Sequence, residues 1–135
     1  MTRFAAILLA LALPGCASGT TRCLLDSQRP MTVVDLFFGS DIPGREPVTD
    51  REWSDFVASV IAKEFPQGFT VTEGDGEWQN AATRAVTRER SKILIVAAPP
   101  TSDLAARISR IRDSYSNLYR QSSVGVVTYD ACGKF

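Results

Sequence analysis

The side chains best suited to chemistry lie in one short polar segment, Arg88-Glu89-Arg90-Ser91-Lys92, which leads into an apolar run. On a strand, alternate side chains share a face, so Glu89 and Ser91 would lie on one face and the three basic groups on the other. A carboxylate beside a hydroxyl suits general base chemistry or ligand binding. The alternative is structural, because a charged strand extension also prevents edge-to-edge pairing.

The sequence lacks residue types and motifs that several kinds of catalytic, metal and cofactor site require. The sequence contains no histidine, which excludes His-based triads, His-ligated zinc and the usual proximal haem ligand. Gly74-Asp75-Gly76 is a turn signal without the further glycine of a dinucleotide-binding motif. We therefore expect no metal and no cofactor. An enzyme would use Glu89 as its base, and the candidates to assist it are Ser91, Lys92, Tyr115 and Arg45.

The first residues of the chain have the pattern of an export signal. Arg3 supplies a positive charge, and Phe4–Leu13 follows without a polar side chain. This is typical of a secretory signal and is too short to span a membrane. Leu13-Pro14-Gly15-Cys16 resembles the lipobox of bacterial lipoproteins. We expect cleavage before Cys16, whose thiol takes a diacylglycerol that anchors the chain in the membrane; the alternative is an ordinary signal with a chance cysteine.

This processing divides the chain into a signal peptide at 1–15, a lipidated tether at 16–30 and one domain at 31–135. The sequence has 15 basic and 15 acidic residues, so it lacks the positive excess that nucleic-acid binding requires. Ala17, and not Asp, follows Cys16. In a Gram-negative cell this predicts the outer membrane, with the domain facing the periplasm.

Lipidation of Cys16 leaves Cys23 and Cys132 as the remaining cysteines. An exported domain lies in an oxidising compartment, where two such cysteines are expected to pair. The disulfide would close a long loop and stabilise the fold by about 2–4 kcal/mol. The alternative is two unpaired thiols near the termini.

Runs of β-branched and aromatic residues, bounded by glycine and proline, predict four strands. The strands are expected at 32–38, at 69–73, within 84–98 and at 124–129. Asp75-Gly76 is predicted to be the turn after the second strand.

Helical spacing predicts two helices. The first begins at a capping box formed by Thr49 and Glu52 and ends before Pro66. The second begins after Ser102 or Asp103. Its apolar stripe contains Leu104, Ile108, Ile111, Tyr115 and Leu118. Tyr115 and Tyr119 lie one turn apart, so we expect their rings to bury against the sheet while their hydroxyls reach a partner.

The element order is β-α-β-β-α-β, which predicts an α+β fold of the ferredoxin-like type. Its four-stranded antiparallel sheet carries both helices on one face. The first and last strands are neighbours in this topology. Cys23 precedes the first strand and Cys132 follows the last, so both should lie at the same end of the sheet, which favours their disulfide.

The other face of the sheet has no helix assigned to it. On the first strand Val34, Leu36 and Phe38 alternate with Val33, Asp35 and Phe37. If one set packs under the helices, the other set still presents two apolar groups around a polar one. A half-apolar open face of this kind predicts a homodimer or a ligand site. The alternative is that the segment 74–80, anchored by Trp78, folds across this face and covers it.

Several spaced motifs occur in a defined order. They are Phe37-Phe38-Gly39, Val48-Thr49-Asp50 to Trp53, Phe65-Pro66-Gln67-Gly68-Phe69-Thr70, Gly76-Glu77-Trp78, Glu89-Arg90-Ser91-Lys92, and Tyr115 through Gln121-Ser122-Ser123-Val124. Together they resemble the bacterial exported family known as domain of unknown function 3574. Ser122 stands where an acidic residue is expected, and Tyr119 where Phe is common. The resemblance implies export and fold, and it implies no activity.

Two functional hypotheses follow. The first is a non-catalytic envelope lipoprotein that binds an unknown protein or small molecule through its open sheet face or its Trp78 loop. Its ligand-binding candidates are Arg45, Trp78 and Gln121. The second is a small hydrolase-like or isomerase-like enzyme that depends on the Glu89 carboxylate. The first is favoured because every member of the catalytic set also has a structural explanation.

Overall fold

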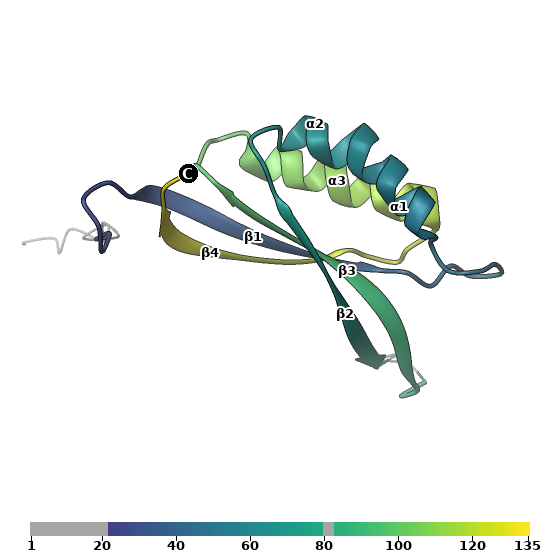
Figure 1. The fold of residues 1–135 in the computed structure, drawn as a ribbon. Coiled ribbons are helices and arrows are strands. Elements are labelled where there is room, and N and C mark those ends of the chain that lie inside the picture. Colours follow the sequence, from purple (N-terminus) through teal and green to yellow (C-terminus); the bar gives the residue numbers. More distant parts are fainter. Residues whose placement is uncertain (1–21, 80–82) are drawn as a thin grey trace, which may run out of the picture.

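A computed structural model describes residues 22–79 and 83–135 of the chain (Figure 1). The predicted signal peptide and Cys16 lie outside these residues. In chain order the elements are β1 (Arg29–Gly39), α1 (Asp50–Phe56), the π-helical turn η1 (Val57–Ile61), α2 (Ala62–Glu64), β2 (Thr70–Gln79), β3 (Val86–Ala98), α3 (Leu104–Tyr119) and β4 (Gly125–Gly133).

The four strands form one antiparallel sheet in the order β2-β3-β1-β4. β1 is central, because it pairs with β3 from Thr32 to Gly39 and with β4 from Arg29 to Phe37. The helices lie together on one face of this sheet (Figure 1). The predicted ferredoxin-like arrangement is therefore confirmed.

The first predicted helix is formed by α1, η1 and α2, which follow one another without a break. It begins at the predicted capping box, in which the Glu52 N–H donates to Thr49 Oγ1 at 3.2 Å and the Thr49 N–H donates to Glu52 Oε2 at 2.9 Å. These bonds satisfy amides that have no partner inside the helix. The buried side chains on this helical run and just after it are Trp53, Phe56, Ile61 and Phe65.

The core lies between β1 and the helices. Val34, Leu36 and Phe38 have 0% exposed surface. The Phe38 ring meets the rings of Trp53 and Tyr115 edge-on, with centroid separations of 5.2 and 4.8 Å, a favourable geometry for aromatic pairs. Because side chains alternate along a strand, this packing leaves the odd-numbered residues of β1 on the open face.

The second strand is longer than predicted, and the predicted turn at Asp75-Gly76 is wrong. β2 continues to Gln79 and pairs with β3 as far as Val86. Cross-strand ion pairs of Arg88 with Glu77 at 2.5 Å and of Arg90 with Glu73 at 2.6 Å accompany this pairing. Opposite charges on facing strands add to this ladder, but exposed ion pairs contribute little. The continuous pairing of β2 with β3 from Thr70 to Gln79 replaces the turn that the local signal predicted.

The pairing of β1 with β3 ends at Ser91. Residues 75–79 and 86–90 therefore project beyond β1 as a two-stranded extension, which we call the arm. Figure 1 shows that the arm bends away from the helices, toward the open-face side of the sheet. Residues 74–79 belong to this strand pair and do not fold across the open face, so the predicted cover anchored by Trp78 is wrong.

The apolar stripe of α3 differs from the prediction at one position. Leu118 is 61% exposed, whereas Tyr119 is buried. Tyr119 continues the four-residue step from Ile111 and Tyr115, and its ring lies 4.7 Å from that of Tyr115. As predicted, both tyrosine hydroxyls find a partner: Tyr115 donates to the Gly39 carbonyl at 2.8 Å, and Tyr119 donates to the Glu52 carbonyl at 3.0 Å.

Cys23 and Cys132 are joined by a disulfide with a Cα–Cα separation of 5.5 Å. Pro30 of β1 pairs directly with Cys132 of β4, so the antiparallel pairing of these strands brings the two cysteines together. All the elements described above, the core and this disulfide lie within residues 22–135.

Replacing both cysteines, as Cys23→Ala/Cys132→Ala, should lower the free energy of unfolding by about 2–4 kcal/mol, because the unfolded chain regains the freedom that the cross-link removes. Urea denaturation of the oxidised protein measures this loss. Reductant should destabilise the wild type and leave the double variant unchanged. Two alkylated thiols in unreduced wild type would contradict the bridge.

Candidate functional site

The helices cover one face of the sheet and leave the other, open face without a helix (Figure 1). The strand register aligns Asp35 of β1 with Ile95 of β3 and with Val127 of β4, and aligns Val33 with Tyr129. Ile95, Val127 and Tyr129 are 37%, 51% and 50% exposed. The surface is thus apolar across three strands, with one carboxylate near its centre.

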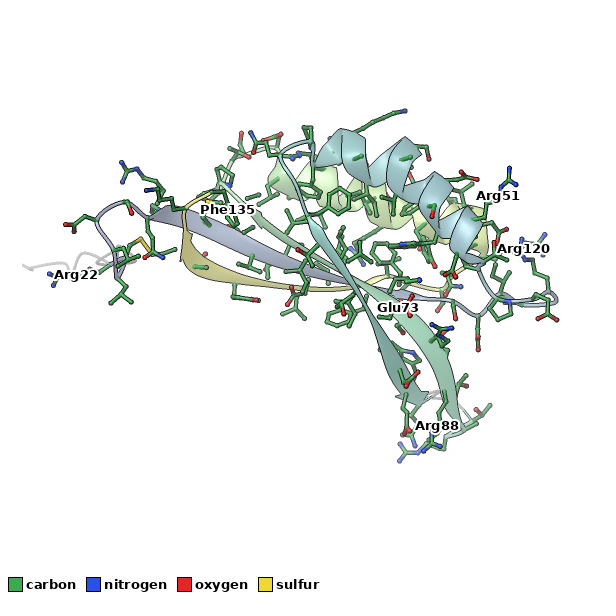
Figure 2. The ribbon with its side chains drawn as sticks, in the orientation of Figure 1. Arg22, Arg51, Glu73, Arg88, Arg120 and Phe135 are labelled. Carbon is green, nitrogen blue, oxygen red and sulfur yellow. A yellow bond between two sulfur atoms is a disulfide. The ribbon has the colours of Figure 1, made fainter. Side chains whose placement is uncertain are left out.

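A groove of about 730 Å³ occupies one end of the open face. Its apolar lining comes from Met31, Phe69, Ile95, Ala97, Pro99 and Phe135. Arg29 and Lys134 also line it. Figure 2 shows Phe135 at the end of the sheet that lies far from the arm.

Glu89 lies at the opposite end of the open face. Its Oε2 accepts a hydrogen bond from the Asp41 N–H at 3.1 Å. Its carboxylate rests directly on Gly39, since a Cβ at Gly39 would lie 2.6 Å from Oε1. In the described part of the chain Glu89 makes no ion pair. Among these residues, its carboxylate has no cationic partner.

Ser91 and Trp78 lie beside Glu89 on the same face. A Cβ at Gly76 would lie 3.0 Å from Ser91 Oγ and 3.1 Å from Trp78 Nε1, so the missing side chain of Gly76 leaves room for both groups. Ser91 is only 6% exposed. Among the described residues, Ser91 Oγ and Asp35 Oδ1 are buried atoms without a hydrogen-bond partner, which is an unfavourable state for a polar group.

Lys92 lies on the face opposite Glu89, as predicted from strand alternation, and its pairing with Phe38 makes this the helix side of the sheet. Its Nζ forms an ion pair with Glu73 and a second one with Asp50 at 3.1 Å. The hydrogen bond with Glu73 is the main reason that the pKa of Lys92 is raised, against an opposing effect of burial. Lys92 is therefore a charged structural group that makes no ion pair with Glu89, although both residues line one pocket of about 320 Å³.

Tyr115 also lies on the helix side, beneath Gly39. Burial is the main cause that raises the pKa of its hydroxyl above the usual range, so the hydroxyl keeps its proton. The Tyr115 hydroxyl bonds to the Gly39 carbonyl, and the Glu89 carboxylate contacts Gly39 from the open face. Tyr115 and Glu89 therefore lie on opposite sides of Gly39. The sheet separates Tyr115 from the open face.

The two remaining candidates lie around the loop after β1. Gln121 Nε2 donates to the Asp41 carbonyl at 2.5 Å. Asp41 is therefore held by Gln121 through its carbonyl and by Glu89 through its N–H. Arg45 binds both carboxylate oxygens of Glu52 at 2.7 Å. This interaction is the main cause that lowers the pKa of Glu52 to about 2, and it occupies Arg45 at the start of α1.

The structure thus brings three of the sequence candidates together on the open face, namely Glu89, Ser91 and Trp78. A carboxylate beside an indole ring suits a ligand that carries a positive charge or hydrogen-bond donors.

Sequence analysis noted Asp35 only as a polar residue between apolar ones, and it missed the roles of Gly39 and Gly76. The signal for Asp35 was visible as the single acidic residue in the strand run.

Residues 22–79 and 83–135 contain neither a metal-binding cluster nor a membrane-spanning helix. No group of three or more Cys, Asp or Glu side chains in this part of the chain is placed to hold a metal ion. No helix described there is long and apolar enough to cross a membrane.

Residues 34–135 match the model of a family described as "Protein of unknown function (DUF3574)". The chain belongs to this family. The resemblance noted in the sequence motifs is therefore confirmed. The match covers β1 from Val34 onward and everything that follows it. No curated protein is similar enough to count as a match.

Solved structures of a phage SAM lyase have a similar fold. The complex with S-methyl-5'-thioadenosine superposes with a TM-score of 0.58 at 14% sequence identity, and the match covers 85% of this chain and 97% of the lyase chain. The apo form gives a TM-score of 0.55 at 16% identity, with 78% and 92% covered. At these identities the similarity establishes the fold alone.

The contact between Glu89 and Gly39 can be measured with a double-mutant cycle. Gly39→Ala should displace the Glu89 carboxylate and break its bond to the Asp41 N–H, at a cost of about 1 kcal/mol of unfolding free energy. In a Glu89→Ala background the same substitution should cost much less, because the new methyl group meets no carboxylate. Equal costs in both backgrounds, from urea denaturation, would contradict the contact.

Proposed function

We propose that this chain is an exported lipoprotein, anchored through Cys16, whose domain binds a ligand or partner on its open sheet face without catalysing a reaction. The exposed apolar surface around Asp35 is the observation that carries the binding role. Folded domains rarely leave a contiguous apolar surface of this kind in water unless it is a binding surface.

The chemistry of the open face supports binding over catalysis. Glu89 accepts one backbone N–H and touches Gly39, and no described side chain completes an acid–base pair with it. Ser91 lies nearby, but its hydroxyl is buried and has no hydrogen-bond acceptor to activate it. A nucleophile needs an adjacent base in hydrogen-bonding geometry.

A second candidate is a carboxylate-dependent enzyme that uses Glu89 as its base. It is favoured by one observation, the absence of any cation paired with this carboxylate among the described residues. The fold neighbours are also consistent with it, since they are a phage SAM lyase, in one structure in complex with S-methyl-5'-thioadenosine and in the other in the apo state. This candidate requires a substrate that brings its own hydrogen-bond donor or positive charge to the Glu89 carboxylate.

The anchor is tested by growth with labelled palmitate. The wild-type chain should take up label, and Cys16→Ser should not, because the thioether that holds the diacylglycerol needs the thiol of Cys16. Cys23→Ala/Cys132→Ala is the matched control and should be labelled like the wild type. Unlabelled wild type would overturn the lipoprotein proposal.

Occupancy of the open face is tested by thiol labelling in intact cells. Val127→Cys places a thiol on the open face, and Arg51→Cys places the control thiol on the exposed start of α1, on the helix side (Figure 2). A bulky maleimide should label the control position readily and Val127→Cys several-fold less. Equal labelling of the two positions in cells would overturn the binding role of this face.

A further inference from the structure

We propose that a second copy of this chain covers the open face, with the two β1 strands antiparallel across the interface. The inference rests on the proposed function, since it names the occupant of the same surface. Three independent features of the open face support it: the placement of its charges, the shape of its two ends, and its unsatisfied polar group.

The first feature is the separation of charge along β1. The open-face column of this strand runs from Arg29 through Met31 and Phe37 to Gly39, on which the Glu89 carboxylate rests. Within residues 22–79 and 83–135, neither Arg29 nor Glu89 makes an ion pair. The Arg29 end therefore carries a guanidinium that bonds only to the carbonyls of Asp26 and Gln28 among the described residues, and the Glu89 end carries a carboxylate without an ion pair there.

A two-fold axis in the interface plane, parallel to the sheet and perpendicular to the strands, can pass over Val34 of β1. This axis pairs each end of the face with the opposite end of the other copy. It brings Arg29 of each copy opposite Gly39 and Glu89 of the other, and Met31 opposite Phe37. Each complex then contains two new ion pairs between unlike ends. An axis parallel to the strands would instead place Arg29 against Arg29 and Glu89 against Glu89, which like-charge repulsion disfavours.

The second feature is shape. The groove of about 730 Å³ lies at the Arg29 end and is lined by Met31, Ile95 and Pro99. The other end carries the side chains of Phe37 and its register partner Ile93. The antiparallel arrangement directs Phe37 and Ile93 of one copy toward the groove of the other. Apolar side chains entering an apolar groove are typical of the centre of an interface.

The third feature is Asp35, whose Oδ1 is buried without a partner in the described chain. Val127 is the β4 neighbour of Asp35, and Tyr129 is the β4 neighbour of Val33. The same two-fold axis places Tyr129 of the second copy over Val127, next to Asp35. The Tyr129 hydroxyl can then donate to Oδ2, the carboxylate oxygen of Asp35 that is not buried, so the carboxylate at the centre of the interface gains a hydrogen bond.

The arm fits this arrangement. It bends toward the open-face side (Figure 1), and its Gly76 lies against Trp78 and Ser91. In an antiparallel pair the two arms extend from opposite ends, so each flanks the other copy. Ser91 and Trp78 then come to lie at the edge of the interface.

The experiment uses a soluble chain that begins at Ala17, produced in an oxidising compartment, since residues 22–135 contain all the described elements and the disulfide. Sedimentation equilibrium should give twice the mass of the chain at micromolar concentration. Tyr129→Asp should raise the dissociation constant at least about tenfold. Leu118→Asp, which changes an exposed apolar residue of α3, is the matched control and should leave association unchanged.

Charge reversal tests the direction of the strands. Arg29→Glu alone and Glu89→Lys alone should each raise the dissociation constant at least about tenfold, and the combined variant should restore it to within about threefold of wild type. Melting curves must confirm that each variant is folded. If Glu89→Lys fails to fold, Arg29→Glu mixed with wild type supplies the test, because the mixed pair keeps one of its two ion pairs and should associate with intermediate strength.

A monomer at about 100 µM, where even a weak specific dimer should form, would overturn the second copy as occupant. A trimer, or equal effects of Tyr129→Asp and Leu118→Asp, would overturn the two-fold arrangement. These failures are distinct from failure of the proposed function. A monomeric soluble chain with Val127→Cys still protected in cells means that a different partner occupies the face, whereas an unprotected thiol rejects the binding role itself.

Discussion

The packing of β1 determines the rest of the structure. This strand pairs on both sides, and its even-numbered residues Val34, Leu36 and Phe38 are sealed against the helices. Alternation along the strand then commits the odd-numbered residues to the opposite face. A shift of one residue would expose three core side chains. The apolar character of the open face is thus fixed by the same register that builds the core.

Gly39, at the end of β1, connects the two faces. Its carbonyl accepts the Tyr115 hydroxyl from below, and its missing side chain leaves room for the Glu89 carboxylate above. The next turn continues this arrangement, since Asp41 donates to Glu89 and accepts from Gln121. Glu89 is therefore held in place by the core through backbone groups. Such support keeps a carboxylate oriented without neutralising its charge.

Local signals predicted most of the fold, and long-range contacts explain what they missed. The capping box at Thr49, the strand runs and the helical stripes act within a few residues, so the sequence displays them directly. The Asp75-Gly76 turn signal was equally local, but the arm forms through the pairing of β2 with β3, a strand that follows later in the chain. The contact of Glu89 with Gly39 joins residues from different strands, and no local pattern reveals it.

The distribution of charge across β3 limits what the open face can bind. Arg88, Arg90 and Lys92 point to the helix side, where acidic residues neutralise them. Glu89 points the other way, and within the described residues its carboxylate receives a single backbone N–H, that of Asp41. An occupant of this end must supply positive charge or hydrogen-bond donors, and an anionic group there would be repelled. This constraint comes from the side chains of the site and not from the fold, which unrelated functions can share.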